Sequence, residues 1–274
     1  MPYDYKNELK KVTDYYKGDS LQKRFSALVC SGIGSGKTYA LSTARKPVHI
    51  DSFDPGGTKC LKPWIDKGEI IVDTEFENED PFNPTAFALW KKKVDLRFQI
   101  GYFDHFGTFA IDSATKWMDA AMNAQLSLKG RTGEAPQRNH DYVPVKIDMQ
   151  NYISKLMRLS CDFILNGHFK EDTEVLSVDT KTGIEKKKTQ FRFLTIGKAA
   201  VTIPLQFDEI YVLETKETSK GYDRYFITEA QGQYIARSRL KSNGKLDVRE
   251  PADYKALLKK IGLDWQDKPK LELE

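Results

Sequence analysis

The chain has 274 residues, and its 43 Lys and Arg against 39 Asp and Glu leave a formal net charge of only +4. The overall charge therefore does not predict nucleic-acid binding. Hydrophobic residues make up 40% of the chain, which is enough for the core of one large α/β domain, with or without a small appendage. No apolar run is long enough to span a bilayer and no signal peptide is recognised, so we expect a cytoplasmic protein without membrane contact.

Residues 1–22 are predicted to form an extension before the main domain. Tyr5, Leu9, Val12 and Tyr16 recur at helical spacing, which predicts a short amphipathic helix. Two interpretations stay open, since the helix either packs on its own domain or docks on a neighbouring subunit.

The main domain is expected over residues 23–262, followed by a tail at 263–274. It begins with an apolar strand at 25–30 and a glycine-rich turn that ends in Gly36-Lys37-Thr38 and opens a helix. This order matches the phosphate-binding loop G-x-x-x-x-G-K-[ST], except that Ser31 replaces the first glycine. Serine fits there if its φ angle is negative. The alternative is a glycine turn that merely joins a strand to a helix.

As a phosphate-binding loop, this segment predicts a site for a nucleoside triphosphate. Main-chain N–H groups would surround the phosphates, the Lys37 ammonium would reach the terminal ones, and the Thr38 hydroxyl would bind Mg²⁺. The predicted nucleotide-binding residues are Gly32, Ile33, Gly34, Ser35, Gly36, Lys37, Thr38 and Tyr39.

Strands and helices alternate along the rest of the domain. Strands are predicted at 47–54, 69–76, 106–112 and 162–167, and helices at 85–98, 113–126 and 145–159. A long hairpin is expected over 170–198, strands at 209–214 and 225–229, and a helix at 252–261. The alternation predicts a mostly parallel sheet flanked by helices, with antiparallel additions in the C-terminal half.

The candidates for catalysis are Lys37, Asp54, Glu75 and His168, of which the last three lie at or near the carboxyl ends of predicted strands, and Asp112 is a candidate for binding Mg²⁺. Asp112 ends an apolar strand, which we expect beside the strand that feeds the turn, and it would hold Mg²⁺ unless it only caps the following helix. Asp54 is the first candidate to orient the attacking water, and Glu75 is its rival. His168 would face the γ-phosphate, or else it simply caps its strand.

The order of these motifs resembles the bacteriophage RecA-like P-loop ATPases of the AAA_24 type, which include the Sak-type single-strand annealing and recombination ATPases. The resemblance covers roughly residues 23–262. It is carried by Gly-Ser-Gly-Lys-Thr (34–38), Phe-Asp-Pro-Gly-Gly (53–57), Ala-Ile-Asp-Ser (110–113), Asn-Gly-His (166–168), Ile-Gly-Lys (196–198) and Phe-Asp-Glu-Ile (207–210).

This resemblance implies a RecA-like core that uses ATP and Mg²⁺, assembles into rings or filaments, and acts on single-stranded DNA. Asp54 takes the position of the family's acidic residue after the second strand, where recombinases proper carry glutamate, so the rate of hydrolysis stays open. A phage-encoded protein would work in the host-cell cytoplasm, with a single-strand-binding protein as a further partner.

The resemblance also gives roles to two basic stretches, 128–142 and 170–196, which would line the DNA path. Their cations are Lys129, Arg131, Arg138, Lys186, Lys187, Lys188 and Arg192. Phe191 and Phe193 would be available to stack on bases. The alternative for the lysine-rich hairpin is a solvated face. Lys198 lies where a lysine could reach the phosphates of an adjacent subunit.

Three functions stay open at this point. The first is an oligomeric ATPase stimulated by single-stranded DNA. The second is a P-loop phosphotransferase, a nucleotide or small-molecule kinase with residues 128–142 as its lid. The third is a non-hydrolysing switch whose nucleotide state sets assembly.

Overall fold

The computed structural model describes residues 4–18, 24–178, 185–194, 202–219, 221–243 and 245–272. The strands are β1 (Ser26–Ser31), β2 (Val48–Ser52), β3 (Ile70–Asp73), β4 (Thr108–Asp112), β5 (Asp162–Val178), β6 (Glu185–Phe193), β7 (Glu209–Thr218), β8 (Gly221–Ile227), β9 (Arg237–Ser238) and β10 (Arg249–Pro251). The helices are α1 (Tyr5–Gly18), α2 (Lys37–Ala40), α3 (Lys62–Ile65), α4 (Ala86–Gln99), α5 (Ala114–Leu128), α6 (Arg138–Leu156) and α8 (Tyr254–Ile261).

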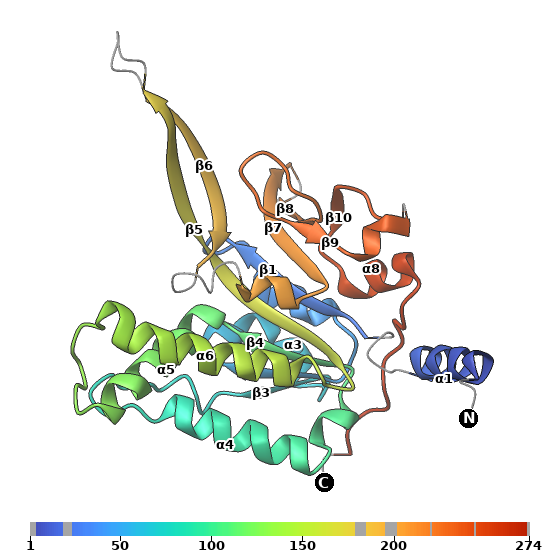
Figure 1. The fold of residues 1–274 in the computed structure, drawn as a ribbon, viewed down its shortest axis with the longest axis horizontal. Helices are drawn as coiled ribbons and strands as arrows, with labels where there is room; N and C mark the ends of the chain where they lie inside the picture. The colour runs from blue at the N-terminus through green and yellow to red at the C-terminus, as the bar shows by residue number, and fades with distance from the viewer. Residues whose placement is uncertain are drawn as a thin grey trace.

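One mixed sheet organises the described strands in the order β10-β8-β7-β1-β5-β4-β2-β3. The strands from β7 to β3 in this order pair in parallel. Strand β8 pairs antiparallel with β7 and β10, β9 with β7, and β6 with β5. The predicted fold class, a mostly parallel sheet with antiparallel additions in the C-terminal half, is confirmed (Figure 1).

Helices cover both faces of the central sheet, which explains why its strands are apolar almost throughout. Successive side chains of a strand point to opposite faces, so Leu28 and Cys30 pack toward α4, α5 and α6, whereas Ala27 and Val29 pack toward α2 and α8. Figure 1 shows α4, α5 and α6 together on one side of the sheet. The site therefore sits at the carboxyl edge of strands that are fixed from both faces.

The strand that carries Asp112 does not neighbour β1, contrary to the prediction. Strand β5 lies between them, and it pairs with β1 on one side and β4 on the other. The sequence does not reveal this order because the three strands that it predicts here are all short apolar runs, and each fits any central position. The insertion brings the polar end of β5 between the phosphate-binding loop and Asp112.

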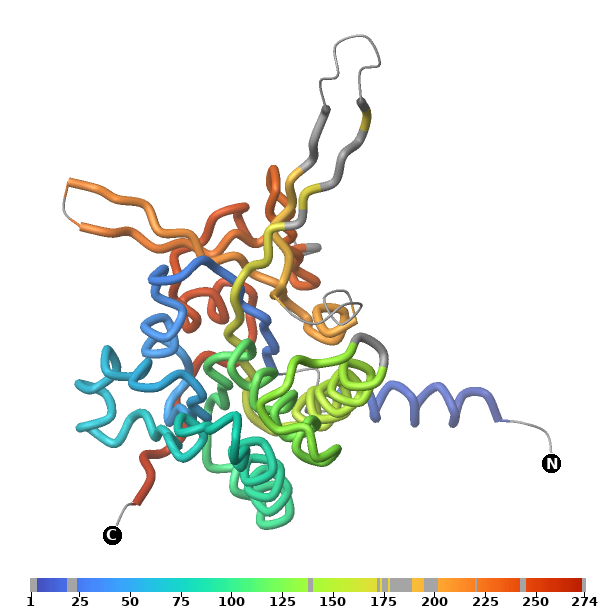
Figure 2. Tube along the Cα trace, turned by 90° about the vertical axis from the view of Figure 1, so that its left-hand side faces the viewer, coloured from blue at the N-terminus to red at the C-terminus, as the bar shows by residue number. Residues whose placement is uncertain are grey.

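The predicted hairpin after the core strand is present, but its first strand is not a separate element. Strand β5 runs without a break from the core at Asp162 into a long arm that pairs with β6. Both views show this arm projecting away from the helices (Figures 1 and 2). The turn at 179–184 and the segment 195–201, which contains Lys198, lie outside the described residues.

The predicted basic loop 128–142 is partly helical, because α6 begins at Arg138 and includes Pro144. A proline inside a helix cannot donate to the carbonyl four residues earlier, which here belongs to His140. The Lys129 ammonium donates to that carbonyl instead. The helix thus begins seven residues before the predicted start at Val145. The His140 carbonyl, which Pro144 leaves without a helical donor, is satisfied by Lys129.

The two ends of the chain contact the domain differently. No residue of α1 is buried, so packing of this helix on its own domain is not found in the described residues. The tail, in contrast, runs along the domain, where the Arg45 Nε donates to the Gln266 carbonyl (3.0 Å) and Lys268 N–H donates to the Lys46 carbonyl (2.8 Å). Among the described helices, none combines the length and apolar character needed to cross a bilayer.

Candidate nucleotide site

The glycine-rich turn between β1 and α2 has the backbone that a phosphate-binding loop requires. Gly34 and Gly36 have φ angles of 75° and 95°, which residues with a Cβ rarely adopt. Ser31, at the position of the missing glycine, does not have a positive φ and ends β1 fully buried. The serine therefore fits without backbone strain.

The Lys37 side chain folds back over this turn. Its ammonium donates to the Ser31 hydroxyl (2.7 Å) and the Gly32 carbonyl (3.1 Å), and only 7% of the residue is exposed. Burial lowers the pKa of Lys37, while the charges of Asp112 and Asp54 oppose that shift. The ammonium thus lies at the start of the turn, where the charges of Asp112 on β4 and of Asp54 just after β2 act on it.

Asp112 lies directly opposite Thr38. Its Oδ2 accepts from the Thr38 hydroxyl (2.6 Å), and its Oδ1 accepts from the Asn166 amide (3.2 Å). Burial raises the pKa of the Asp112 carboxyl, and the Thr38 hydrogen bond opposes this. Ser113, not Asp112, is the N-cap residue of α5. Asn166 is a member of the site that the sequence analysis did not assign.

This group of side chains fits Mg²⁺. The Thr38 hydroxyl and the Asp112 carboxylate are oxygen ligands, which Mg²⁺ prefers. The buried Oδ1 of Asn166 has no hydrogen-bond partner in the described part of the chain, so a further acceptor lies beside the carboxylate. Thr38 and Asp112 would bind the ion, directly or through its water shell.

A pocket of about 310 Å³ collects most of the candidates. It is lined by Gly34, Ser35, Gly36, Lys37, Thr38, Tyr39, Asp54, Gly57, Cys60, Asp112, His168 and Arg224. The Phe53 N–H donates to the Asp112 carbonyl (2.7 Å), which brings Asp54 beside Asp112. His168 contacts the Thr115 hydroxyl through Nδ1 (3.1 Å), and burial, followed by the Lys37 charge, lowers its pKa.

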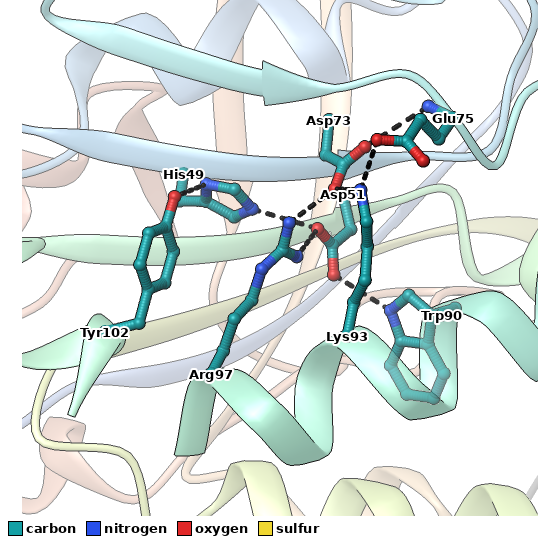
Figure 3. Close-up of polar contacts among 8 residues, drawn as sticks. All are labelled: His49, Asp51, Asp73, Glu75, Trp90, Lys93, Arg97 and Tyr102. Atoms are coloured by element: carbon teal, nitrogen blue, oxygen red, sulfur yellow. Dashed lines mark hydrogen bonds and ion pairs between the residues drawn. The ribbon is translucent and has the colours of Figure 1, made fainter. Parts of the chain in front are cut away.

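Glu75 is not among the residues that line this pocket. Figure 3 shows it at the edge of a separate cluster on β2, β3 and α4. The Lys93 ammonium pairs with Glu75 and with Asp73 (2.9 Å), and the Glu75 side chain is 59% exposed. Of the two acidic candidates, only Asp54 lies with the phosphate-binding loop.

A second glutamate, Glu77, supports the loop that carries Asp54. Its carboxylate accepts from the Ser52 hydroxyl (2.6 Å) and from the Gly56 N–H (2.9 Å), one on each side of Asp54. The sequence analysis assigned no role to Glu77. The carboxylate clamps the turn 53–57 against the end of β2.

In the basic stretch 128–142, Lys129 and Arg131 are paired with carboxylates. The carboxylate of Asp141 is buried between the Lys129 ammonium (2.8 Å) and the Arg131 guanidinium (2.8 Å), and these contacts hold its pKa well below the usual range. Arg131 also pairs with Glu134 (2.7 Å). Both cations are therefore committed to partners in their own segment. Arg138 begins α6, and its side chain is not described.

On the hairpin, β6 carries Lys186, Lys187 and Lys188, which lie opposite Ser177, Val175 and Glu174 in the strand register; their side chains are not described. Arg192 lies opposite Lys170 at the base of the arm.

The two phenylalanines proposed for base stacking differ in exposure. Phe193 is only 5% exposed and packs over Gly167, where a Cβ would lie 2.8 Å from its Cδ2 and closer still to its Cε2, so its ring is not available to bases. Phe191 is half-buried and packs with Phe169 and Tyr234, with ring centroids 5.5 and 5.6 Å away. These three rings line a cleft of about 680 Å³ on the other side of the phosphate-binding loop.

The comparison with protein families agrees with the geometry. The family model AAA_24, described as an AAA domain, matches residues 23–240. Among solved structures, the KaiC-like protein PH0186 from the hyperthermophilic archaeon Pyrococcus horikoshii OT3 is similar at 12% sequence identity and a TM-score of 0.38, over 78% of this chain and 81% of that chain. No curated protein matches the chain.

Proposed function

The chain belongs to the AAA_24 family of AAA domains, and from this premise we propose that it is a Mg²⁺-dependent ATPase that acts on single-stranded DNA. One observation carries the hydrolytic part. The lysine of the phosphate-binding loop, the Thr38–Asp112 pair and a second carboxylate, Asp54, all line one pocket. An ATPase needs these groups together, whereas a site that only binds nucleotide does not need the second carboxylate.

Each side chain has a distinct role in this proposal. Mg²⁺ held by Thr38 and Asp112 neutralises charge on the β- and γ-phosphates when it is bound. Lys37 releases the Gly32 carbonyl and turns its ammonium to the phosphates. Asp54 orients the attacking water, and His168 contacts the γ-phosphate from the end of β5. Burial of Lys37 and Asp112 strengthens these interactions because little water screens them.

Phosphate release by three variants tests this assignment. Lys37→Ala is expected to abolish turnover, and Asp54→Asn to lower kcat by at least about 100-fold, as general-base groups typically contribute. Glu75→Gln is the matched control and is expected to keep wild-type kcat, because its carboxylate lies outside the pocket. Loss of activity in Glu75→Gln with retention in Asp54→Asn would refute the assignment. A phosphorylated acceptor in a panel of nucleosides and nucleotides would favour a kinase instead.

The DNA part of the proposal is supported by the projecting arm of β5 and β6 (Figure 2). Strand β6 of this arm carries three consecutive lysines, Lys186, Lys187 and Lys188. Because Lys129 and Arg131 are paired with Asp141, the arm is the better candidate for phosphate contacts. Each contact that releases counterions changes the salt dependence of single-strand binding by a slope of about −0.7.

Lys187→Glu with Lys188→Glu tests the arm. We expect this double variant to weaken binding of single-stranded DNA and to flatten its salt dependence, while ATP affinity is retained. Lys92→Glu with Lys270→Glu, at two exposed positions, has the same change in net charge and is expected to bind DNA like the wild type. Equal DNA affinity in both double variants would overturn the role of the arm.

Self-assembly completes the proposal. The apolar side chains of α1, among them Leu9 and Val12, are more than half exposed, and a neighbouring copy is the expected partner for them. Light scattering with ATP should show oligomers of the full chain and fewer subunits in each particle after removal of residues 1–22. The same number of subunits in both proteins would exclude this role of α1.

A further inference from the structure

Arg224 of β8 reaches the phosphate-binding loop from a part of the chain that the nucleotide motifs do not include. Its Nε donates to the Ser35 carbonyl (3.2 Å), and its guanidinium carbon lies 5.2 Å from the centroid of the Tyr39 ring. Its register partner on β7, Thr215, donates its hydroxyl to the same carbonyl (2.9 Å). The β7–β8 hairpin thus holds the loop through one cross-strand pair.

The contact is close enough to constrain the loop sequence. The Arg224 side chain passes directly over the Cα of Gly36, where an added Cβ would lie 2.8 Å from its Cδ and closer still to its Nε. Gly36 also has a φ of 95°. Glycine is therefore needed at this position both for its backbone angle and for the passage of the arginine.

Among the described residues, no carboxylate forms an ion pair with Arg224. Its contacts in the described part of the chain are the Ser35 carbonyl and the Tyr39 ring, neither of which carries a negative charge. The side chain nevertheless lines the nucleotide pocket, together with Lys37 and Asp112. A planar guanidinium in such a position suits an oxyanion, because two of its N–H groups can bind two phosphate oxygens.

We infer that Arg224 binds the α-phosphate end of a nucleoside di- or triphosphate within the same subunit, an inference that rests on the proposed nucleotide site. The two cations lie at opposite ends of the loop. Lys37 contacts Ser31 and Gly32 at the start, where the β- and γ-phosphates lie in such loops, whereas Arg224 lies over Ser35, Gly36 and Tyr39 at the end. Arg224 therefore binds ADP and ATP alike and does not sense the γ-phosphate.

Equilibrium binding of Mg-ATP and Mg-ADP to the full chain tests this inference. Arg224→Ala is expected to weaken both nucleotides by the same factor, about 10- to 100-fold, as for a lost charged hydrogen bond. Arg224→Lys should recover part of the loss, because it keeps the charge without the planar fork. Arg239→Ala removes an exposed arginine paired with Asp208 and is expected to bind like the wild type.

A measurement on the unaltered protein covers the case in which the variants do not fold. Phenylglyoxal modifies arginines, and mass mapping should show Arg224 protected by ADP as strongly as by ATP, with Arg239 unprotected. Weakened binding of ATP alone, or modification of Arg224 that ADP does not change, would overturn the inference. Wild-type protein that binds both nucleotides without releasing phosphate would refute the proposed ATPase and leave Arg224 in its role.

Discussion

The polar cluster in Figure 3 makes a quantitative prediction for Arg97→Met. The Asp51 carboxylate is 0% exposed and accepts from the Arg97 guanidinium (2.9 Å), the Trp90 indole N–H (2.9 Å) and His49 (3.0 Å). Asp73 is its register partner on the neighbouring parallel strand, and Arg97 binds both carboxylates. Removing the guanidinium leaves two like charges side by side, one of them fully buried.

The expected cost follows from this burial. Breaking a buried ion pair by deleting one partner costs about 3–5 kcal/mol, because the other charge stays in a poorly solvated place. For a chain of this size each kcal/mol shifts the melting temperature by about 2–4 °C, so Arg97→Met should melt about 6–20 °C below the wild type. Asp51→Asn added to Arg97→Met should recover a large part of this loss, since the stranded charge is then gone.

Scanning calorimetry of the nucleotide-free proteins measures the effect. Lys93→Met is the control, because its partners are the exposed Glu75 and Asp73, which keeps Arg97. We expect it to melt within about 4 °C of the wild type, as for a pair worth about 1 kcal/mol. Arg97→Met within 2 °C of the wild type, or a double variant no more stable than the single one, would show that the cluster does not carry buried charge.

Three further predictions concern Asp162, Gly36 and Glu77. Burial raises the pKa of Asp162 to about 6 from 3.8, so the unfolded chain releases this proton first and the free energy of unfolding falls by about 2 kcal/mol from pH 4 to 6; urea titrations should show this slope in the wild type and not in Asp162→Asn. Gly36→Ala should lower the melting temperature by at least about 2 °C, because of its φ and the arginine above it, whereas Gly32→Ala, whose Cβ would meet nothing within 4 Å, should not. Glu77→Ala should lower kcat with little change in KM, since it frees the turn that carries the proposed base, and an unchanged kcat would contradict that role.

The features that the sequence predicts are those with a local signature. A glycine turn followed by Lys37 and Thr38 constrains the backbone within eight residues, and Asp112 is recognisable because it ends an apolar strand. The sheet class follows from the alternation of strands and helices, and this alternation can be recognised without knowing which residues pair over long distances in the sequence. Strand order is different, because it depends on which apolar strands pair, and β1, β4 and β5 look alike in this respect.

The residues that the sequence does not reveal are polar side chains whose partners lie far along the chain. Arg224 contacts Ser35 across 189 positions, and Asn166 contacts Asp112 across 54. One signal was present, since Asp51 follows Ile50 inside a predicted strand, and a carboxylate that is buried there requires a partner. The partner itself, Arg97, could be any cation on a facing helix, and only the packing of α4 selects it.

The continuity of β5 relates the nucleotide pocket to the arm in a way that separate predicted elements cannot. Asn166 binds Asp112 and His168 lines the pocket, and the same strand then pairs with β6 from Phe169 onward. Strand β6 of the arm is thus joined by main-chain hydrogen bonds to β5, the strand whose Asn166 contacts the Asp112 carboxylate. Phe193, packed over Gly167, fixes the base of the arm at this point. The end of β5 at the nucleotide pocket therefore continues into the arm without an intervening loop.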